Sequence, residues 1–223
     1  MNPKESQSHS SARIVIVDDH PVMLMGLKHL ITSADGLAVV GEAGTCAEAL
    51  AVFASCQDID LAIIDVSLPD RSGLELLKEL RIVWTELKCL VISSHDEEVY
   101  AERVLRAGGR GYVMKDRAPE QLVEAIQKVL AGGIFLSPKM TAQMMETFAG
   151  GGSSGSTVSA LTDRELEVFR AIGEGKTSRE VAGELGISIR TIDAHRTHIK
   201  DKLQIKDAAE LSYQAIRWVE SQS

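Results

Sequence analysis

Long apolar runs are absent from this sequence of 223 residues, and cysteine is scarce. No run approaches the roughly 18 to 20 apolar residues that a membrane-spanning helix needs, which argues against membrane contact. Residues 1–11 are polar and lack the apolar stretch of a signal peptide, so we interpret them as a disordered tail. The three cysteines Cys46, Cys56 and Cys89 lie in apolar or helical surroundings, which favours buried free thiols. These features together predict a cytoplasmic protein.

Positive charge is also in short supply, because the chain has a net charge of −8. The deficit lies before residue 160, where 14 basic residues stand against 21 acidic ones, whereas the remainder carries 10 and 11. An acidic first part suits cation binding better than nucleic acid. In the nearly neutral second part, any nucleic-acid surface must be a local patch.

Short apolar segments alternate with helical patterns over the first 130 residues. Strands are expected at 13–17, 37–41, 61–65, 88–93 and 110–115. Helices are expected from 21, and at 45–55, 72–83, 96–107 and 119–130. Ser/Thr-x-x-Glu patterns predict capping boxes at Thr45 and Ser72. The alternation predicts an α/β domain with a doubly wound, five-stranded parallel sheet.

A segment rich in glycine and serine at 149–156 is the clearest domain boundary in the chain. We assign 12–135 to the α/β domain and 136–160 to a linker, with room for one helix at 137–148. Residues 161–223 are expected to form a small all-α domain of four helices, with capping boxes at Thr162 and Thr177. Two short helices joined by a turn with Gly186 match the helix-turn-helix pattern.

Polar side chains stand at the ends of four expected strands. Asp18 and Asp19 follow the first strand, Asp65 ends the third, Ser93 the fourth and Lys115 the fifth. Because parallel strands end at one edge of a sheet, these side chains can share one pocket. Carboxylates with open coordination positions suit Mg²⁺, and a carboxylate can attack phosphorus to give an aspartyl phosphate. The sequence therefore predicts a phosphoryl site at Asp65, with the hydroxyl and the amine contacting phosphoryl oxygens.

Each of these residues also has an ordinary interpretation. Asp18 and Asp19 stand where turn and helix-cap residues occur. Ser93 alone is a common strand-end hydroxyl, and Lys115 beside Asp116 can be a surface pair worth under about 1 kcal/mol. Their order, each at a strand end, favours the shared pocket.

The set Asp18, Asp19, Asp65, Ser93 and Lys115 resembles the receiver domains of two-component response regulators, over about residues 12–135. The resemblance implies that a sensor histidine kinase phosphorylates Asp65 and that the acidic pair binds Mg²⁺ with it. It also implies that Ser93 moves to contact the phosphoryl group and that Tyr112 rotates inward with it. The expected fold is accordingly receiver-like, within the broader flavodoxin-like class.

Three stretches of the second domain resemble the LuxR-type DNA-binding domain: LTDRELEV at 161–168, GKTSREVA at 175–182 and TIDAHR at 191–196. Together with a receiver-like domain, they resemble response regulators of the NarL/FixJ type. The resemblance implies double-stranded DNA as a partner, and a homodimer through the last helix when the protein is phosphorylated or DNA-bound. By periodicity alone, Leu211, Ala215 and Trp218 on that helix are either core or dimer contacts.

The third helix of this domain, at 188–203, is expected to enter the major groove. At about 100° per residue, Ile192, Ile199 and Leu203 form its core stripe, so the opposite face is offered to DNA. Asp193 either accepts a hydrogen bond from cytosine or faces solvent. Five basic and two acidic residues lie between 190 and 206, a local excess that suits phosphate contacts. The candidate contacts are Arg190, Thr191, Asp193, Ala194, His195, Thr197, His198 and Lys200.

We therefore predict a transcriptional regulator whose DNA binding is controlled by phosphorylation of Asp65. No enzymatic activity is expected beyond self-phosphorylation from small donors and self-dephosphorylation. One alternative is a Mg²⁺-dependent phosphatase or phosphotransferase, which would turn over phosphate esters repeatedly. A flavodoxin-like nucleotide-binding module is a second, although no glycine-rich or aromatic cradle supports it. A third, a regulator that works without phosphorylation, would not need the full set of pocket residues.

Overall fold

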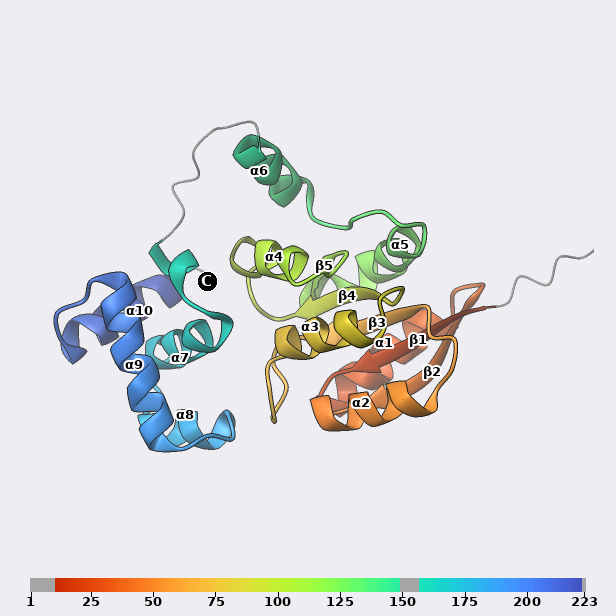
Figure 1. The fold of residues 1–223 in the computed structure, drawn as a ribbon. Coiled ribbons are helices and arrows are strands. Elements are labelled where there is room, and N and C mark those ends of the chain that lie inside the picture. Colours follow the sequence, from red (N-terminus) through yellow and green to blue (C-terminus); the bar gives the residue numbers. More distant parts are fainter. Residues whose placement is uncertain (1–10, 149–156, 222–223) are drawn as a thin grey trace, which may run out of the picture.

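The computed structural model describes residues 11–148 and 157–221, which form an α/β part and a helical part (Figure 1). Nearly all of the tail expected at 1–11, and the whole Gly/Ser-rich segment at 149–156, lie outside the described residues. Within the described ranges, no helix is long and apolar enough to cross a membrane. All three cysteines are free thiols. Cys46 and Cys89 are buried as predicted, whereas Cys56 is only half-buried, so the prediction of burial does not hold for Cys56.

The α/β part contains one sheet of five parallel strands in the order β2-β1-β3-β4-β5. All residues of β3 are buried, because helices cover both faces of a central parallel strand. The predicted doubly wound five-stranded parallel sheet is confirmed. The strands are β1 (Ala12–Val17), β2 (Leu37–Ala43), β3 (Leu61–Asp65), β4 (Lys88–Ser93) and β5 (Tyr112–Met114).

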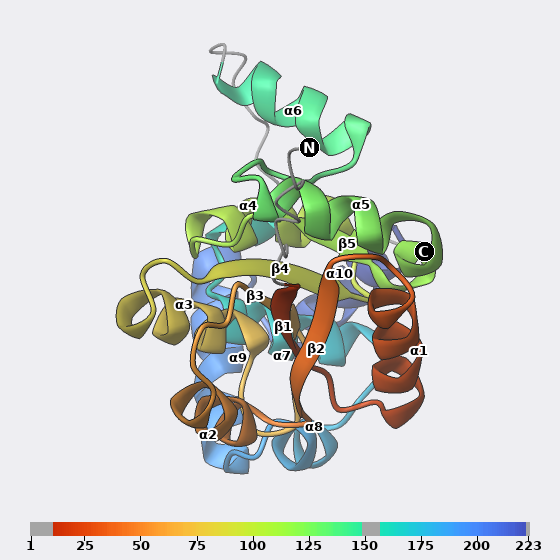
Figure 2. The same ribbon diagram turned by 90° about the vertical axis from the view of Figure 1, so that its right-hand side faces the viewer.

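Five helices cover the two faces of this sheet (Figure 2). Leu27 of α1 and Ile126 of α5 pack in one core with Ile63, while Phe53 of α2 packs in the other core with Ile64. Ile63 and Ile64 enter different cores because successive strand side chains point to opposite faces. The helices are α1 (Pro21–Thr32), α2 (Cys46–Ser55), α3 (Gly73–Val83), α4 (Glu97–Arg106) and α5 (Ala118–Leu130).

The ends of some elements differ from the sequence expectation. Thr45 and Ser72 cap their helices through their own hydroxyl groups, whereas both hydrogen bonds of a capping box are present at Thr162 and Thr177. The fifth strand is shorter than expected and ends before Lys115, which begins the 3-10 turn η1 (Lys115–Arg117). Lys115 therefore extends from a turn at the sheet edge, and not from a strand residue.

A further helix, α6 (Pro138–Phe148), lies against α4 (Figure 1). The backbone amide of Ser137 donates to the Glu97 carboxylate at 2.8 Å. Lys139 forms an ion pair with Glu98, and Met140 is buried. The start of α6 is thus fixed to the first turn of α4, on the outer side of the sheet.

The helical part consists of the turn η2 and four helices, of which α7 packs against α9 and α10. Gly173 permits the close crossing of α7 and α10, because a Cβ atom there would lie 2.4 Å from the carbonyl oxygen of Ala215. Helices α8 and α9 form the predicted helix-turn-helix. The elements are η2 (Thr157–Ala160), α7 (Asp163–Gly173), α8 (Ser178–Glu184), α9 (Ile189–Leu203) and α10 (Ala208–Glu220).

Helix α7 is the element of the helical part that faces the sheet (Figure 1). The Asp163 carboxylate lies 2.7 Å from Lys78 Nζ of α3 and 3.0 Å from Arg103 Nη1 of α4. Arg103 also donates to the backbone carbonyl oxygens of Val158 and Leu161. Buried apolar side chains of both parts form one cluster. We call these contacts of η2 and α7 with the α/β part the docking interface.

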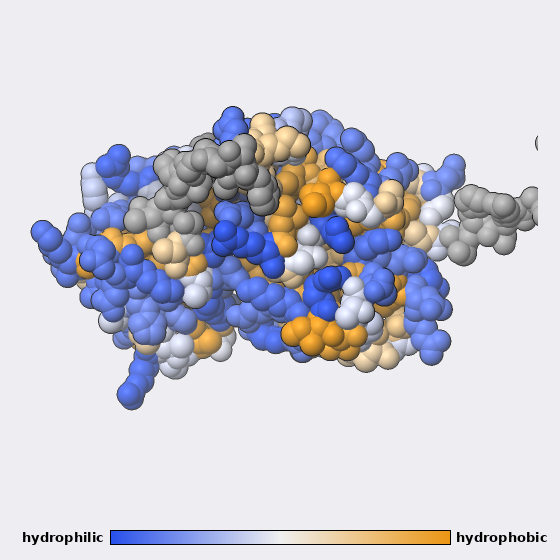
Figure 3. All heavy atoms as spheres, turned by 45° about the horizontal axis from the view of Figure 1, so that its top comes forward, coloured by the Kyte–Doolittle hydropathy of each residue, from blue (hydrophilic) through white to orange (hydrophobic). Residues whose placement is uncertain are grey.

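On the face shown in Figure 3, most side chains are hydrophilic, and apolar side chains form separate patches between them. Among the large apolar side chains that are exposed, Val22 and Met25 belong to α1, Ile82 to α3, and Tyr213 and Ile216 to α10. These positions contribute nothing to the core.

Candidate functional site

Asp65 lies at the carboxyl end of the central strand, beside two other buried charged groups. The Lys115 ammonium is 2.8 Å from Asp65 Oδ2 and 2.7 Å from Asp18 Oδ2. The side chains of Asp18 and Asp65 are at most 3% exposed. Strands β1 and β3 are neighbours in the sheet, so their parallel course brings both carboxylates to one edge, as the sequence predicted.

The second acidic residue and its neighbour complete this cluster. Asp19 is exposed, and its Oδ1 lies 2.7 Å from His20 Nδ1. Asp18, Asp19, His20 and Asp65 each offer a ligand atom, and these atoms all lie within 4.8 Å of one another. We call Asp18, Asp19, Asp65 and Lys115 the acidic pocket. Sequence reasoning missed His20, although its position directly after the acidic pair was a signal.

Burial and charge set the protonation of this pocket. Burial raises the pKa of Asp65 to about 6, and the Lys115 ammonium opposes that rise. Burial works to lower the pKa of Lys115, but the Asp65 and Asp18 carboxylates outweigh it and raise that pKa. At neutral pH the Asp65 carboxyl group is therefore mostly ionised, and the Lys115 amine stays protonated beside it.

Ser93 and Tyr112 lie on the neighbouring strands. Ser93 is completely buried whereas Ser94 is exposed. Ser93 follows Ile92, the β4 residue paired with Asp65. The Tyr112 ring is buried, and its hydroxyl donates to the backbone carbonyl oxygen of His95 at 2.6 Å. Both side chains thus lie beside the acidic pocket, and the aromatic ring is already turned inward.

His95 is a residue of this region that sequence reasoning missed. It lies in the loop between β4 and α4, with its ring stacked on Tyr100 at a centroid distance of 5.0 Å. Its Nε2 is 2.7 Å from Ser67 Oγ, and its Nδ1 contacts Arg170 of α7. Sequence spacing gives no signal for this contact, because the two partners belong to different parts of the chain.

Helix α9 presents the face that the sequence assigned to DNA. The core stripe Ile192, Ile199 and Leu203 is buried. The Thr197 hydroxyl donates to the Asp193 carbonyl oxygen at 3.0 Å, so part of its hydrogen-bonding capacity is used within the helix. Of the candidate contacts, the exposed residues are Arg190, Thr191, Asp193, Ala194, Thr197 and His198, and the half-buried ones are His195 and Lys200.

Two of the three candidate residues on the last helix belong to the core. Leu211 and Ala215 are completely buried. Trp218 is half-buried and packs on Phe169 of α7 with ring centroids 5.7 Å apart. Trp218 also lines a small cavity of about 80 Å³ at the docking interface, opposite Tyr100 of α4. The exposed apolar surface of α10 comes from other residues.

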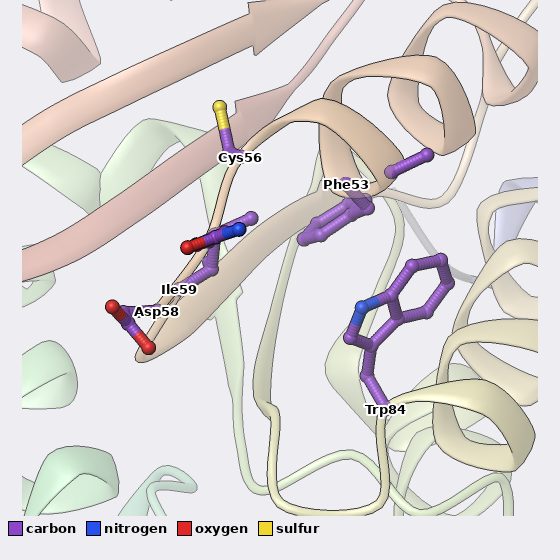
Figure 4. A pocket seen from close by; sticks show the side chains of 7 residues that line it. Phe53, Cys56, Asp58, Ile59 and Trp84 are labelled. Atoms are coloured by element: carbon purple, nitrogen blue, oxygen red, sulfur yellow. The ribbon is translucent and has the colours of Figure 1, made fainter.

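A second cavity, of about 390 Å³, lies far from this chemistry. It is an open hollow between the ends of α2 and α3, at the amino edge of the sheet (Figure 4). The Phe53 and Trp84 rings pack together on one side of it, with centroids 5.7 Å apart, and Cys56 and Asp58 lie on the other side. None of its lining residues belongs to the acidic pocket, so the volume of a cavity does not by itself locate the functional site.

Comparison with known proteins gives the family. The model of the response regulator receiver domain matches residues 14–127, and that of bacterial regulatory proteins of the luxR family matches residues 159–215. The oxygen regulatory protein NreC of Staphylococcus carnosus is 33% identical over 211 residues, which cover 92% of this chain and 97% of that protein. The transcriptional regulatory protein UhpA of Escherichia coli K12 is 33% identical over 199 residues, or 89% and 95%.

Solved structures of response regulators are similar in fold. RcsB of Salmonella enterica serovar Typhimurium, bound to the promoter rprA, superimposes with a TM-score of 0.64 at 25% identity and covers 91% of this chain and 97% of its own. A LuxR-family response regulator from Aurantimonas is 34% identical, with a TM-score of 0.58 over 63% of this chain and 99% of its own. The chain belongs to the response regulators, and among them to those that join a receiver domain to a LuxR-family regulatory domain. It is a transcriptional regulator of the two-component type, and the predicted family and general function are confirmed.

Proposed function

We propose that Asp65 accepts a phosphoryl group from a sensor histidine kinase and that this modification controls DNA binding by the helical part. The observation that carries the proposal is the position of Asp65, buried at the carboxyl end of β3 with the Lys115 ammonium 2.8 Å away. A carboxylate held beside a fixed cation is suited to attack phosphorus, because the cation offsets charge that the phosphoryl oxygens bring.

Mg²⁺ fits the acidic pocket through Asp18, Asp19 and Asp65. Asp18 Oδ2 is buried and makes no hydrogen bond of acceptable geometry, although the Lys115 ammonium lies nearby. Carboxylate oxygens with open coordination positions are what Mg²⁺ prefers. When bound, the ion neutralises phosphoryl charge and orients the phosphoryl oxygens.

The chain's own residues account for the transfer step. An Asp65 carboxylate oxygen forms a bond to phosphorus while the bond from phosphorus to the donor breaks, and the donor leaves with that electron pair. At neutral pH, above a pKa of about 6, most Asp65 carboxyl groups are ionised and able to attack. The Lys115 ammonium and the Ser93 hydroxyl are assigned to the phosphoryl oxygens, with Tyr112 following the hydroxyl. Self-phosphorylation from small donors and self-dephosphorylation are the only reactions we assign to the protein.

We further propose that α9 enters the major groove of double-stranded DNA. The support is its exposed face, with Arg190 and Lys200 placed for phosphates and Asp193, Ala194 and Thr197 for base edges. The small net charge of residues 160–223 makes one copy a weak binder. A homodimer on two half-sites would therefore raise the affinity. We retain 12–135 as the receiver, 136–160 as the linker and 161–223 as the DNA-binding domain.

Acetyl phosphate with Mg²⁺ tests the assignment of Asp65. Wild type should gain the mass of one phosphoryl group and shift its DNA affinity, while Asp65→Asn should do neither. An unmodified wild type, or equal labelling of both proteins, would overturn Asp65 as the acceptor. Repeated turnover of small phosphate esters would instead support the phosphatase alternative.

A further inference from the structure

His95 uses each of its polar groups to connect neighbouring residues. Its backbone amide donates to Ser93 Oγ at 3.2 Å, and its backbone carbonyl oxygen accepts from the Tyr112 hydroxyl at 2.6 Å. On the ring, Nε2 lies 2.7 Å from Ser67 Oγ and Nδ1 contacts the Arg170 guanidinium of α7. One residue thus joins three positions around Asp65 to a residue of the DNA-binding domain.

The contact with Arg170 determines where the ring carries its proton. A guanidinium can only donate, so Nδ1 of His95 must accept. The neutral ring then has its hydrogen on Nε2, which donates to Ser67 Oγ and leaves the Ser67 hydroxyl hydrogen free for another acceptor. Burial, together with the Arg170 charge, lowers the pKa of His95 to about 3, which keeps the ring neutral. A residue of the other domain therefore selects the tautomer.

Ser67 places this chain of contacts at the acidic pocket. It follows Asp65 by two residues, and its backbone works to lower the pKa of the Asp65 carboxyl group. Its side chain is exposed at the mouth of the pocket. A phosphoryl group on Asp65 would therefore bring acceptor oxygens close to the Ser67 hydroxyl, and to the buried Ser93 hydroxyl on β4.

We propose that His95 and Arg170 are positioning residues that couple the state of Asp65 to the docking of α7. The inference rests on the proposed role of Asp65 as phosphoacceptor. When the Ser93 hydroxyl turns toward a phosphoryl oxygen, the oxygen to which the His95 amide donates moves with it. The loop follows, the ring leaves Arg170, and docking weakens. By thermodynamic linkage, docking disfavours the phosphorylated state by the same factor.

The other charged contacts of the docking interface provide a control. Arg103 and Lys78 hold Asp163 without contacting His95 or the acidic pocket. They stabilise docking in either state of Asp65. Arg106 lies on the same helix as Arg103, but it is exposed and pairs with Glu102 of its own helix. Losing Arg106 should therefore leave both docking and coupling intact.

Amide hydrogen exchange of the full chain, before and after treatment with acetyl phosphate and Mg²⁺, measures the coupling directly. In wild type and Arg106→Ala, phosphorylation should raise exchange in α7 and the β4–α4 loop by about fivefold or more. Arg103→Ala should start from faster exchange and still show that rise. Arg170→Ala should also start faster but show no further rise, and Arg170→Lys should restore part of it.

Two substitutions of His95 separate its ring contact with Arg170 from its ring contact with Ser67. His95→Asn keeps an acceptor near the Nδ1 position for Arg170 but is too short to reach Ser67. His95→Gln reaches Ser67 but leaves Arg170 without its acceptor. His95→Asn should keep the rise in exchange, because its backbone amide and its contact with Arg170 remain. His95→Gln should start from faster exchange and show no further rise, and intact mass will show that both variants are phosphorylated.

The outcomes distinguish this inference from the proposed function. Wild type that takes up no phosphoryl group would overturn the role of Asp65, and the coupling with it. Phosphorylated wild type without a rise in exchange would overturn the coupling alone. The same holds if Arg170→Ala retains the full rise, or if Arg103→Ala loses it equally.

Discussion

Arg103 of α4 and Asp163, the first residue of α7, form an ion pair of 3.0 Å in which each side chain is only 15% exposed. A hydrogen bond to a charged group contributes about 1.5 to 3 kcal/mol. Arg103→Ala should therefore weaken docking by about 2 kcal/mol. In urea denaturation followed by circular dichroism, the helical part should unfold before the α/β part. Arg106→Ala is the matched control, and coincident transitions unchanged from wild type would contradict this prediction.

Asp65→Asn should stabilise the metal-free protein at neutral pH. The pKa of Asp65 is about 6 in the folded chain and lower in the unfolded chain, so the folded state binds the extra proton between these values. Stability therefore falls as pH rises through that window, and an uncharged amide avoids the loss. We expect a gain of about 1 to 3 kcal/mol in EDTA, reduced by the lost partner of Lys115.

Mg²⁺ should reverse this order of stability and make wild type more stable than Asp65→Asn. Binding to the folded state raises stability by mass action, so the melting temperature of wild type should increase with Mg²⁺ concentration. Asp65→Asn should respond much less because it lacks one proposed ligand. Equal shifts in both proteins would place the ion elsewhere.

Docking should weaken as pH falls below about 6.5, the ordinary pKa of histidine. Undocked His95 takes up a proton there, whereas the docked ring, with a pKa of about 3, does not. Docking then loses up to about 1.4 kcal/mol per pH unit. The charged groups facing the ring are Arg170 of α7, Glu174 directly after α7, and Lys115. The two cations stay charged, and Arg170 and Lys176 outweigh burial in lowering the pKa of Glu174.

Small-angle scattering at pH 7.5 and 5.5 checks this pH dependence. The maximum dimension of wild type should increase at the lower pH. His95→Gln, which has no titrating ring, should show the same dimension at both values. A pH response of equal size in the variant would assign the effect to another group.

Gly173→Ala should destabilise the helical part. A methyl group there would lie 2.4 Å from the Ala215 carbonyl oxygen and 2.5 Å from Val219 Cγ2. Forcing α7 and α10 apart should cost about 1 to 3 kcal/mol, measured by urea denaturation. Gly183→Ala in α8, where nothing lies within 4 Å of the added atom, is the control and should stabilise by up to about 1 kcal/mol. Equal midpoints for both variants would exclude the close crossing as a constraint.

Arg190→Ala should weaken DNA binding uniformly across sequences. The exposed guanidinium at the start of α9 is placed for a phosphate, and each lost phosphate contact reduces the slope of log affinity against log salt by about 1. A salt titration of wild type, Arg190→Ala and Arg106→Ala measures it. A change in sequence preference with an unchanged slope would mean that Arg190 reads a base.

The sequence was sufficient for the parts of the molecule that follow from local pattern and sheet topology. The strand ends alone place Asp18 and Asp65 together, because neighbouring parallel strands must end at the same edge. Lys115 was expected on a strand and lies instead on a turn, one residue beyond. Its ammonium reaches the same two carboxylates because a long side chain tolerates such a shift.

His95 and Arg170 show what local pattern cannot give. They lie 75 residues apart, on opposite sides of a domain boundary, and neither belongs to a recognisable motif. Their contact depends on how two finished domains pack, which periodicity does not encode. The same limit applies to Asp163, which reads as a helix-start residue and proves also to be an interdomain partner.

The outward face of α9 stays exposed while α7 is docked against the α/β part. Docking therefore does not silence the chain by burying the side chains proposed to read DNA. Docking must therefore control DNA binding by another route than covering that helix face. It can limit the space available for a duplex, or it can limit the pairing of two chains. Control of that kind changes how steeply the occupancy of the DNA site rises with protein concentration. It leaves the preferred base sequence unchanged.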